Sequence, residues 1–165
     1  MNEQNGAMAL GMTERLKPIH AAVRDMVRNE ITPAGEEFLA EVPKEGRWVY
    51  TARQKEILEG LKATAKSRKL WNFWLTDSER GYGLSTVEYA YLAEEMGKTP
   101  MGAEVFNCNA PDTGNMEVFE RYGTEAMKAA WLAPLLEGEI RSAYLMTEPD
   151  VASSDATNIA MSCVR

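Results

Sequence analysis

The sequence predicts a mainly α-helical protein: an N-terminal helical bundle followed by the truncated start of a strand-rich second domain. Three observations predict this fold class. Apolar residues recur every three or four positions from Thr13 onward, as on the buried face of a helix. Residues that commonly begin and end helices lie between these periodic stretches. Near Glu139 the pattern changes to short apolar runs, which are typical of strands.

The first helix is predicted to begin at Thr13, a favourable N-cap residue. Pro33 is expected to kink or break it, because proline has no N–H to donate and its ring crowds the preceding turn. Residues 41–50 contain proline and glycine and are expected to connect this helix to the next. The predicted buried stripe comprises Leu16, Ile19, Val23, Met26, Val27, Ile31, Ala34 and Phe38.

Two residue pairs, Thr51 with Gln54 and Ser85 with Glu88, have the spacing of a capping box at a helix N-terminus. Each is followed by an apolar-periodic stretch, so a helix is predicted after each pair. The other predicted features are a helix end at Gly97, a turn-rich loop over 77–83, a short helix after Pro111 and a last helix from Thr124 to Gly138.

Two short strands are predicted after the helices, over residues 142–147 and from Ile159. Pro149 ends the first of them. A domain that has just begun its strands cannot complete a sheet in the residues that remain, and an unfinished edge promotes aggregation. We therefore expect residues 1–138 to form a helical domain, residues 139–165 to begin an incomplete second one, and the natural protein to be longer.

Composition excludes several classes of function. The net charge of −7 argues against nucleic-acid binding, which needs lysine and arginine to neutralise phosphates. No apolar run approaches the length of a membrane span. Two distant cysteines and a single histidine, His20, argue against a disulfide scaffold and against a metal site. Because the N-terminal residues lack a signal-peptide pattern, a cytoplasmic protein is expected.

The segment from Tyr144 to Asp155 is the richest in candidate chemistry. Its hydroxyl and carboxylate side chains can bond nearby backbone amides, which is typical of a capped turn at a strand end. The same features could instead hold a planar polar ligand, with the hydroxyl of Thr147 at the apolar edge. The residues alone leave both interpretations open.

Thr147-Glu148-Pro149, followed by Ser154-Asp155, resembles the flavin-contact signature of the acyl-CoA dehydrogenase family. The usual family form has Gly-Ala-Gly between these two parts, whereas this chain has four residues there. The longer form, Thr-Glu-Pro-Asp-Val-Ala-Ser-Ser-Asp, resembles a subgroup whose animal members can carry an added phosphotransferase-like domain. The segments that also resemble this subgroup are 94–97, 105–108 and 110–118, within a similarity that runs from about residue 13 to the end.

The resemblance implies FAD as cofactor and a β-barrel-like middle domain after the helices. The residues that it places beside the cofactor are Tyr144, Leu145, Met146, Thr147, Ser153 and Ser154. The hydroxyl of Thr147 would bond the flavin ring near N5, the atom that takes the hydride. The extra residue leaves either Ser153 or Ser154 at the family's serine position, and Ser154 is preferred because Asp155 follows it.

The resemblance further implies an acyl-CoA substrate that is dehydrogenated at its α and β carbons. Ser154 would also face the thioester and pantetheine arm, while Asn109 and Asp112 would face the acyl tail. Asp112 could instead be a favourable anion at a helix N-terminus. The catalytic base is expected in a C-terminal domain, so no catalytic residue is assigned in this chain. An electron-transfer flavoprotein as electron acceptor and a homodimer or homotetramer are also implied.

Two other functions remain open from the sequence. The same fold could serve a flavin oxidase or monooxygenase, or the chain could be a non-catalytic helical interaction module. Trp71 and Trp74 are interpreted as core or interface aromatics, and His20 as a structural residue. Nucleophilic use of Cys108 is not expected, because no basic neighbour in the sequence would lower its pKa.

Overall fold

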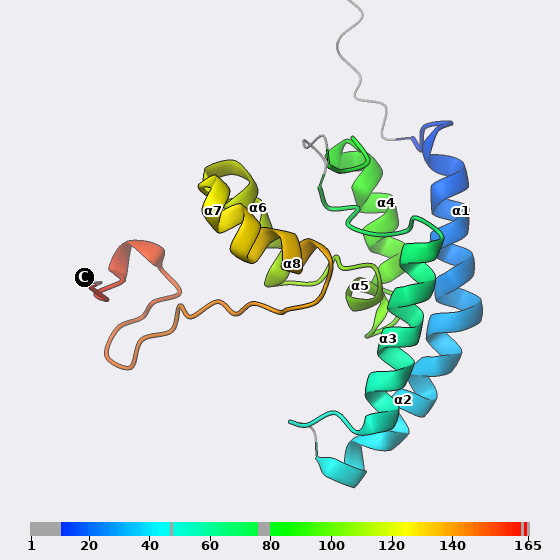
Figure 1. The fold of residues 1–165 in the computed structure, drawn as a ribbon, viewed down its shortest axis with the longest axis horizontal. Helices are drawn as coiled ribbons and strands as arrows, with labels where there is room; N and C mark the ends of the chain where they lie inside the picture. Colours follow the sequence, from blue (N-terminus) through cyan, green and yellow to red (C-terminus); the bar gives the residue numbers. More distant parts are fainter. Residues whose placement is uncertain (1–10, 47, 76–79, 163, 165) are drawn as a thin grey trace, which may run out of the picture. The chain divides into compact units, whose positions relative to one another are not determined.

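The computed structural model describes residues 11–46, 48–75, 80–162 and 164, drawn in colour in Figure 1. The chain divides into two compact units, Met1–Thr113 and Gly114–Arg165. All the regular secondary structure of the described residues is helical. None of the described helices is both long enough and apolar enough to span a membrane.

The first unit begins with a long helical run. Helix α1 (Leu16–Met26) continues through a π-helical turn (Val27–Ile31) into α2 (Thr32–Glu45) (Figure 1). The break expected at Pro33 is therefore a widened turn just before this residue, which lies in the first turn of α2. A proline is tolerated there because the first N–H groups of a helix have no partner within it.

The described part of this unit also contains α3 (Ala52–Ser67), α4 (Thr86–Met96) and the short α5 (Gly102–Val105). Helix α1 packs against α4, α2 against α3, and α5 against both α3 and α4. The predicted stripe lies in the core: Leu16, Val23, Met26, Val27 and Ile31 are buried, and Ile19, Ala34 and Phe38 pack against them partly buried. Trp71 and Trp74 also pack against this core.

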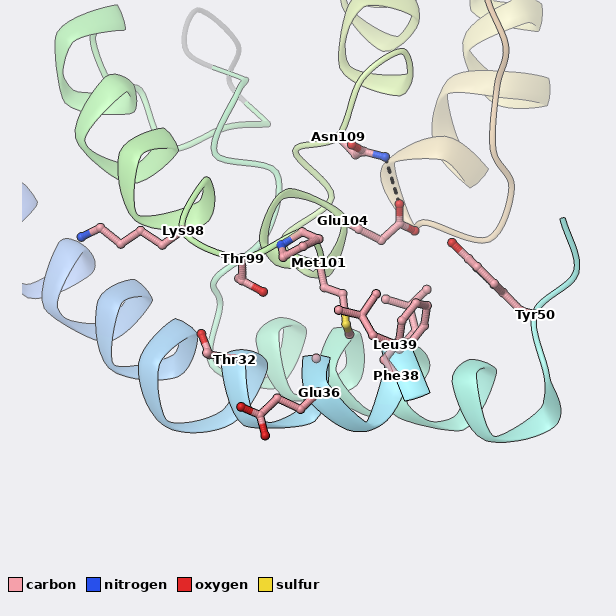
Figure 2. A pocket seen from close by; sticks show the side chains of 13 residues that line it. Thr32, Glu36, Phe38, Leu39, Tyr50, Lys98, Thr99, Met101, Glu104 and Asn109 are labelled. Atoms are coloured by element: carbon pink, nitrogen blue, oxygen red, sulfur yellow. Dashed lines mark hydrogen bonds between the residues drawn. The ribbon is translucent and has the colours of Figure 1, made fainter. Parts of the chain in front are cut away.

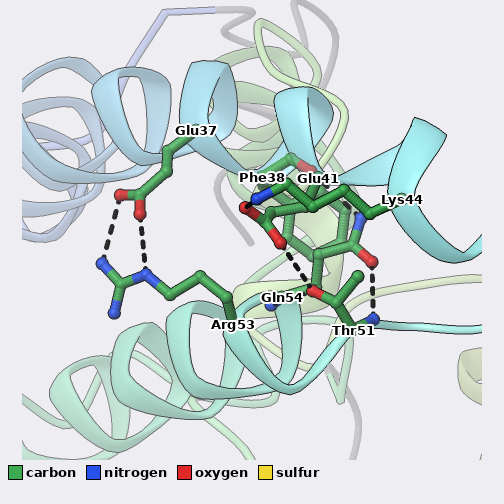
Figure 3. A network of polar contacts seen from close by, with 7 residues as sticks. All are labelled: Glu37, Phe38, Glu41, Lys44, Thr51, Arg53 and Gln54. Carbon is green, nitrogen blue, oxygen red and sulfur yellow. Dashed lines mark hydrogen bonds and ion pairs between the residues drawn. The ribbon is translucent and has the colours of Figure 1, made fainter.

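Both predicted capping boxes are present. At α3 the hydroxyl of Thr51 accepts from the N–H of Gln54 at 3.1 Å, and the N–H of Thr51 donates to the Gln54 side chain at 3.0 Å. The Gln54 amide also donates to the carbonyl of Phe38 at 3.0 Å, so the cap ties α3 to α2 (Figure 3). Arg53 adds a two-pronged ion pair with Glu37 between the same helices (Figure 3).

The second unit holds most of α6 (Asp112–Tyr122), which begins at the end of the first unit. A further helical run contains α7 (Glu125–Met127), a π-helical turn (Lys128–Leu132) and α8 (Ala133–Leu136). As predicted, Thr124 caps this run, its hydroxyl accepting from the N–H of Met127 at 3.3 Å. A 3₁₀ turn (Ala156–Asn158) follows later. Buried apolar side chains of this unit are Met116, Leu132 and Leu135.

The two predicted strands are not observed. Residues 141–148 and 159–162 have no regular secondary structure, and no strand occurs anywhere in the described residues. A strand is defined by hydrogen bonds to a neighbouring strand, and the described chain offers none. The start of a β-domain is therefore not seen. Residues 77–79 of the predicted loop lie outside the described residues.

Candidate functional site

The segment predicted to contact the flavin leaves α8 as extended chain in the second unit. The side chains of Tyr144 and Leu145 are 67% and 89% exposed, Thr147 is exposed and Met146 is half-buried. Aromatic and apolar side chains are seldom left in water without a partner in such a cluster. These four residues are therefore accessible for binding.

The two serines of the signature have different surroundings. Ser153 is buried, 3% exposed, and its hydroxyl accepts from the N–H of Glu148 at 2.9 Å. Ser154 is exposed. The hydroxyl of Ser153 thus holds the loop together, whereas the hydroxyl of Ser154 is accessible to a ligand.

Two carboxylates shape the rest of this loop. The Glu148 carboxylate accepts from the N–H groups of Ala160 and Met161, at 3.0 and 2.9 Å. The Asp155 carboxylate accepts from the N–H and hydroxyl of Thr157, at 3.0 and 2.7 Å. The hydroxyl and amide of Thr157 hold the pKa of Asp155 below its usual value. The capped turn predicted from the residues is therefore present.

Asn115 ties this segment to α6 within the second unit. Its side-chain amide donates to the hydroxyl of Ser142 at 2.8 Å and to the carbonyl of Ala143 at 3.4 Å. Sequence reasoning missed this contact. Asn115 and Ser142 are far apart in the sequence, and no local motif marks either residue.

A separate cavity of about 440 Å³ lies in the first unit (Figure 2). Apolar and polar side chains line it, from α2, the chain between α2 and α3, α3, and the chain between α4 and α6. The residues around it are Thr32, Gly35, Glu36, Phe38, Leu39, Tyr50, Leu58, Lys98, Thr99, Pro100, Met101, Glu104 and Asn109. Asn109, predicted to face an acyl tail, is thus at a cavity, but Asp112 is not among its lining residues.

Asn109 belongs to a polar cluster at this cavity. Its amide donates to one oxygen of Glu104 at 3.0 Å (Figure 2), and Lys62 approaches the other oxygen at 2.9 Å. The side chains of Lys62 and Glu104 are only 10% and 14% exposed, and Lys62 also approaches Glu59 at 3.2 Å, so nearby opposite charges compensate these largely buried groups. Asp112 is buried in the first turn of α6, where a helix N-terminus stabilises an anion.

His20 and Cys108 contact other side chains and the backbone in ways that fit a structural role. His20 lies 3.3 Å from the carboxylate of Glu95 and stacks edge-on with Tyr91. Burial raises the pKa of Cys108 to about 12, so its sulfur is a protonated thiol and not a nucleophilic thiolate. Within the described chain, no group of three potential metal ligands is found.

Comparison with known proteins agrees with the resemblance. The profile described as "Acyl-CoA dehydrogenase, N-terminal domain" matches residues 13–139. "Acyl-CoA dehydrogenase family member 10" of Mus musculus is 43% identical over 98% of this chain and 15% of its own length. "Acyl-CoA dehydrogenase family member 11" of Gallus gallus is 48% identical over 87% of this chain and 18% of its own length.

"Probable acyl-CoA dehydrogenase FadE2" of Mycobacterium tuberculosis is 55% identical over 62% of this chain and 25% of its own length. The solved structure of an acyl-CoA dehydrogenase homologue from Mycobacterium abscessus superposes with a TM-score of 0.77 at 49% identity. That match covers 89% of this chain and 37% of the other. The chain therefore spans well under half the length of these relatives. It belongs to the acyl-CoA dehydrogenase family and corresponds to the family's N-terminal domain.

Proposed function

We propose that this chain contributes the helical domain and the first flavin-facing segment of an FAD-dependent acyl-CoA dehydrogenase. One observation supports the proposal: in a chain of this family, Tyr144, Leu145 and Thr147 are exposed while the loop after them is fixed by its own hydrogen bonds. An exposed apolar strip that ends in a hydroxyl fits a planar, mostly apolar ring with polar edges.

Each residue of the segment then has a role in binding and orientation. Tyr144, Leu145 and Met146 lie against the flavin ring and keep water from it. The Thr147 hydroxyl bonds the ring near N5, and Ser154 faces the thioester and pantetheine arm. Ser153 supports the loop from inside, as its hydrogen bond to the Glu148 N–H indicates. When bound, FAD supplies the hydride-accepting chemistry, for which the protein provides placement and electrostatics.

Asn109 and Asp112 are proposed to contact the acyl tail. Asn109 supports this role because it lies at a cavity with the apolar side chains of Phe38, Leu58 and Met101. No residue of this chain is proposed as the base that removes the α-proton. A carboxylate of a C-terminal domain would supply it.

We further propose that the longer signature places this chain in the subgroup that carries it. The relatives named acyl-CoA dehydrogenase family members 10 and 11 are 43% and 48% identical to this chain. An electron-transfer flavoprotein as acceptor and a homodimer or homotetramer are part of the same proposal.

The test is to express the complete coding region that contains this sequence. The product should be yellow and flavin-bound, its flavin should bleach anaerobically when acyl-CoA is added, and an electron-transfer flavoprotein should reoxidise it. Fast reoxidation by oxygen would favour an oxidase or monooxygenase instead. A well-folded product that ends at Arg165 and carries no flavin would favour the non-catalytic module.

A further inference from the structure

Glu148 is held at three points, although it has no role in the proposed chemistry. Its N–H donates to the hydroxyl of buried Ser153, and its two carboxylate oxygens accept from Ala160 and Met161. Pro149 follows it and restricts it to extended backbone, since the proline ring disfavours the helical conformation of the residue before it. Both the backbone and the side chain of Glu148 are therefore constrained.

The two oxygens of the Glu148 carboxylate are placed to accept from two neighbouring amides. Two consecutive backbone N–H groups meet two different oxygens of the same side chain, at 3.0 and 2.9 Å. A hydrogen bond to a charged acceptor is stronger than a neutral one. They close residues 148–161 into a loop whose two ends meet at Glu148.

Thr147 is the residue immediately before this closure. A hydroxyl that must bond one flavin atom has to be placed within about 0.5 Å. The Thr147 side chain is exposed, so neighbouring side chains do not fix its position. The support has to come from the backbone on either side. Asn115 holds the chain at Ser142 and Ala143, and Glu148 holds it directly after Thr147.

We propose that Glu148 is a positioning residue: by closing the 148–161 loop on the amides of Ala160 and Met161, it fixes the backbone that presents Thr147 to the flavin. That the ligand is a flavin rests on the proposed function. The closure of the loop is independent of that function, because it rests on the hydrogen bonds of Glu148.

The first experiment uses the 165-residue chain without any ligand. Glu148→Gln keeps the shape but turns one acceptor oxygen into an N–H₂ donor that faces another donor. Amide hydrogen exchange at Ala160 and Met161, followed by NMR, should become about tenfold faster, as for the loss of one hydrogen bond. Glu148→Asp should do the same, because its shorter side chain cannot reach both amides.

Asp150→Asn is the matched control, because it changes the same charge in the same loop. Within the described chain Asp150 has no polar partner, so exchange at Ala160 and Met161 should stay as in the unchanged chain. Amides of α6, which lies mostly in the same unit as the loop, report whether that unit of each variant is folded. Equal exchange rates in a folded Glu148→Gln chain would overturn the proposal.

The second experiment uses the flavin-bound product of the complete coding region. Glu148→Gln should shift the flavin absorbance and lower kcat more than it raises KM, as a displaced Thr147 would, while Asp150→Asn should do neither. A lower Tm with unchanged flavin spectrum and unchanged kcat would make Glu148 merely structural and overturn the proposal. If the complete product carries no flavin, the proposed function fails, and amide exchange still decides whether Glu148 closes the loop.

Discussion

At the scale of single residues, the buried carboxylate of Glu88 connects two segments that are far apart in the sequence. Only 4% of its side chain is exposed. It accepts from the hydroxyl of Thr13 at 2.5 Å, from Arg15 at 2.8 Å and from the N–H of Ser85 at 2.8 Å. These donors, Arg15 first, hold the pKa of Glu88 well below its usual value of 4.5. One side chain thereby joins the start of the first helix to the cap of α4.

We expect Glu88→Gln to destabilise the first unit and to change its response to acid. A carboxylate whose pKa is lowered by folding stabilises the fold above its unfolded pKa, and that contribution is lost as the pH falls below about 4.5. Thermal unfolding across pH 3 to 7 should show a lower Tm at neutral pH and a shallower loss toward acid. Glu14→Gln, in an exposed ion pair with Lys17, is the control and should change little. If the Tm of Glu88→Gln fell toward pH 3 as steeply as that of the unchanged chain, Glu88 would not be the source of this acid sensitivity.

Thr147 is the residue on which the proposed chemistry depends most. In the complete flavoprotein, Thr147→Val keeps the volume and removes the hydroxyl. Losing one hydrogen bond of about 0.5–1.5 kcal/mol, or more if the flavin atom is left without a partner, should lower kcat roughly 3- to 30-fold. KM should change less, because the bond acts mainly in the transition state.

Stopped-flow reduction of the flavin by acyl-CoA measures this step directly. Thr147→Ser keeps the hydroxyl and should be milder. An ordinary exposed residue would show no kinetic change, so an unaltered kcat and flavin spectrum in Thr147→Val would remove Thr147 from the site.

At the scale of elements, Gln54 connects two helices through one side chain. It is 1% exposed and bonds the N–H of Thr51 and the carbonyl of Phe38. Gln54→Ala would leave both backbone groups without this partner, and we expect a loss of about 2–3 kcal/mol in the free energy of unfolding. Urea unfolding measures the loss. Lys55→Ala, an exposed neighbour on the same helix, should stay within about 0.5 kcal/mol.

The junction of α4 and α5 requires glycine at position 102, because a side chain there would clash. A Cβ added at Gly102 would lie 2.1 Å from the carbonyl oxygen of Met96, closer than atoms can approach. Gly102→Ala must therefore push α5 away from α4, and we expect a loss of about 1–3 kcal/mol in stability. Gly60→Ala in α3 meets no atom within 4 Å and should stabilise the chain by about 0.5–1 kcal/mol. Equal effects of the two variants would refute this explanation.

At the scale of the whole molecule, the chain carries one side of a binding site and not a complete one. We expect the 165-residue chain to bind FAD weakly or not at all, and to show no dehydrogenase turnover. The contacts of one exposed segment cannot offset the loss of translational and rotational freedom on binding. A flavin absorbance titration and an acceptor-dye assay with acyl-CoA measure both properties. A yellow chain that reduces the dye would contradict this expectation.

The features that the sequence predicted correctly are those that depend on near neighbours. Both capping boxes are present because Thr51 with Gln54, and Ser85 with Glu88, are close enough along the chain to bond whatever the rest of the fold does. The buried stripe from Leu16 to Ile31 follows from the period of the helix. The assignment of Tyr144 to Thr147 and of Ser154 to a flavin site stays a prediction.

Tertiary structure decided the features that need distant partners. Within the described residues the apolar runs predicted as strands form no strand, because a strand requires ladder hydrogen bonds to a second extended segment. The tie from Asn115 to Ser142, the closure of Glu148 on Ala160 and Met161, and the ion pair of Lys62 with Glu104 each join residues whose approach no local pattern encodes. The sequence by itself determined the helices and the family signature, since both rest on short-range geometry. That Ser154 and not Ser153 is accessible, and that Glu148 closes the loop, depends on contacts that form only in the folded chain.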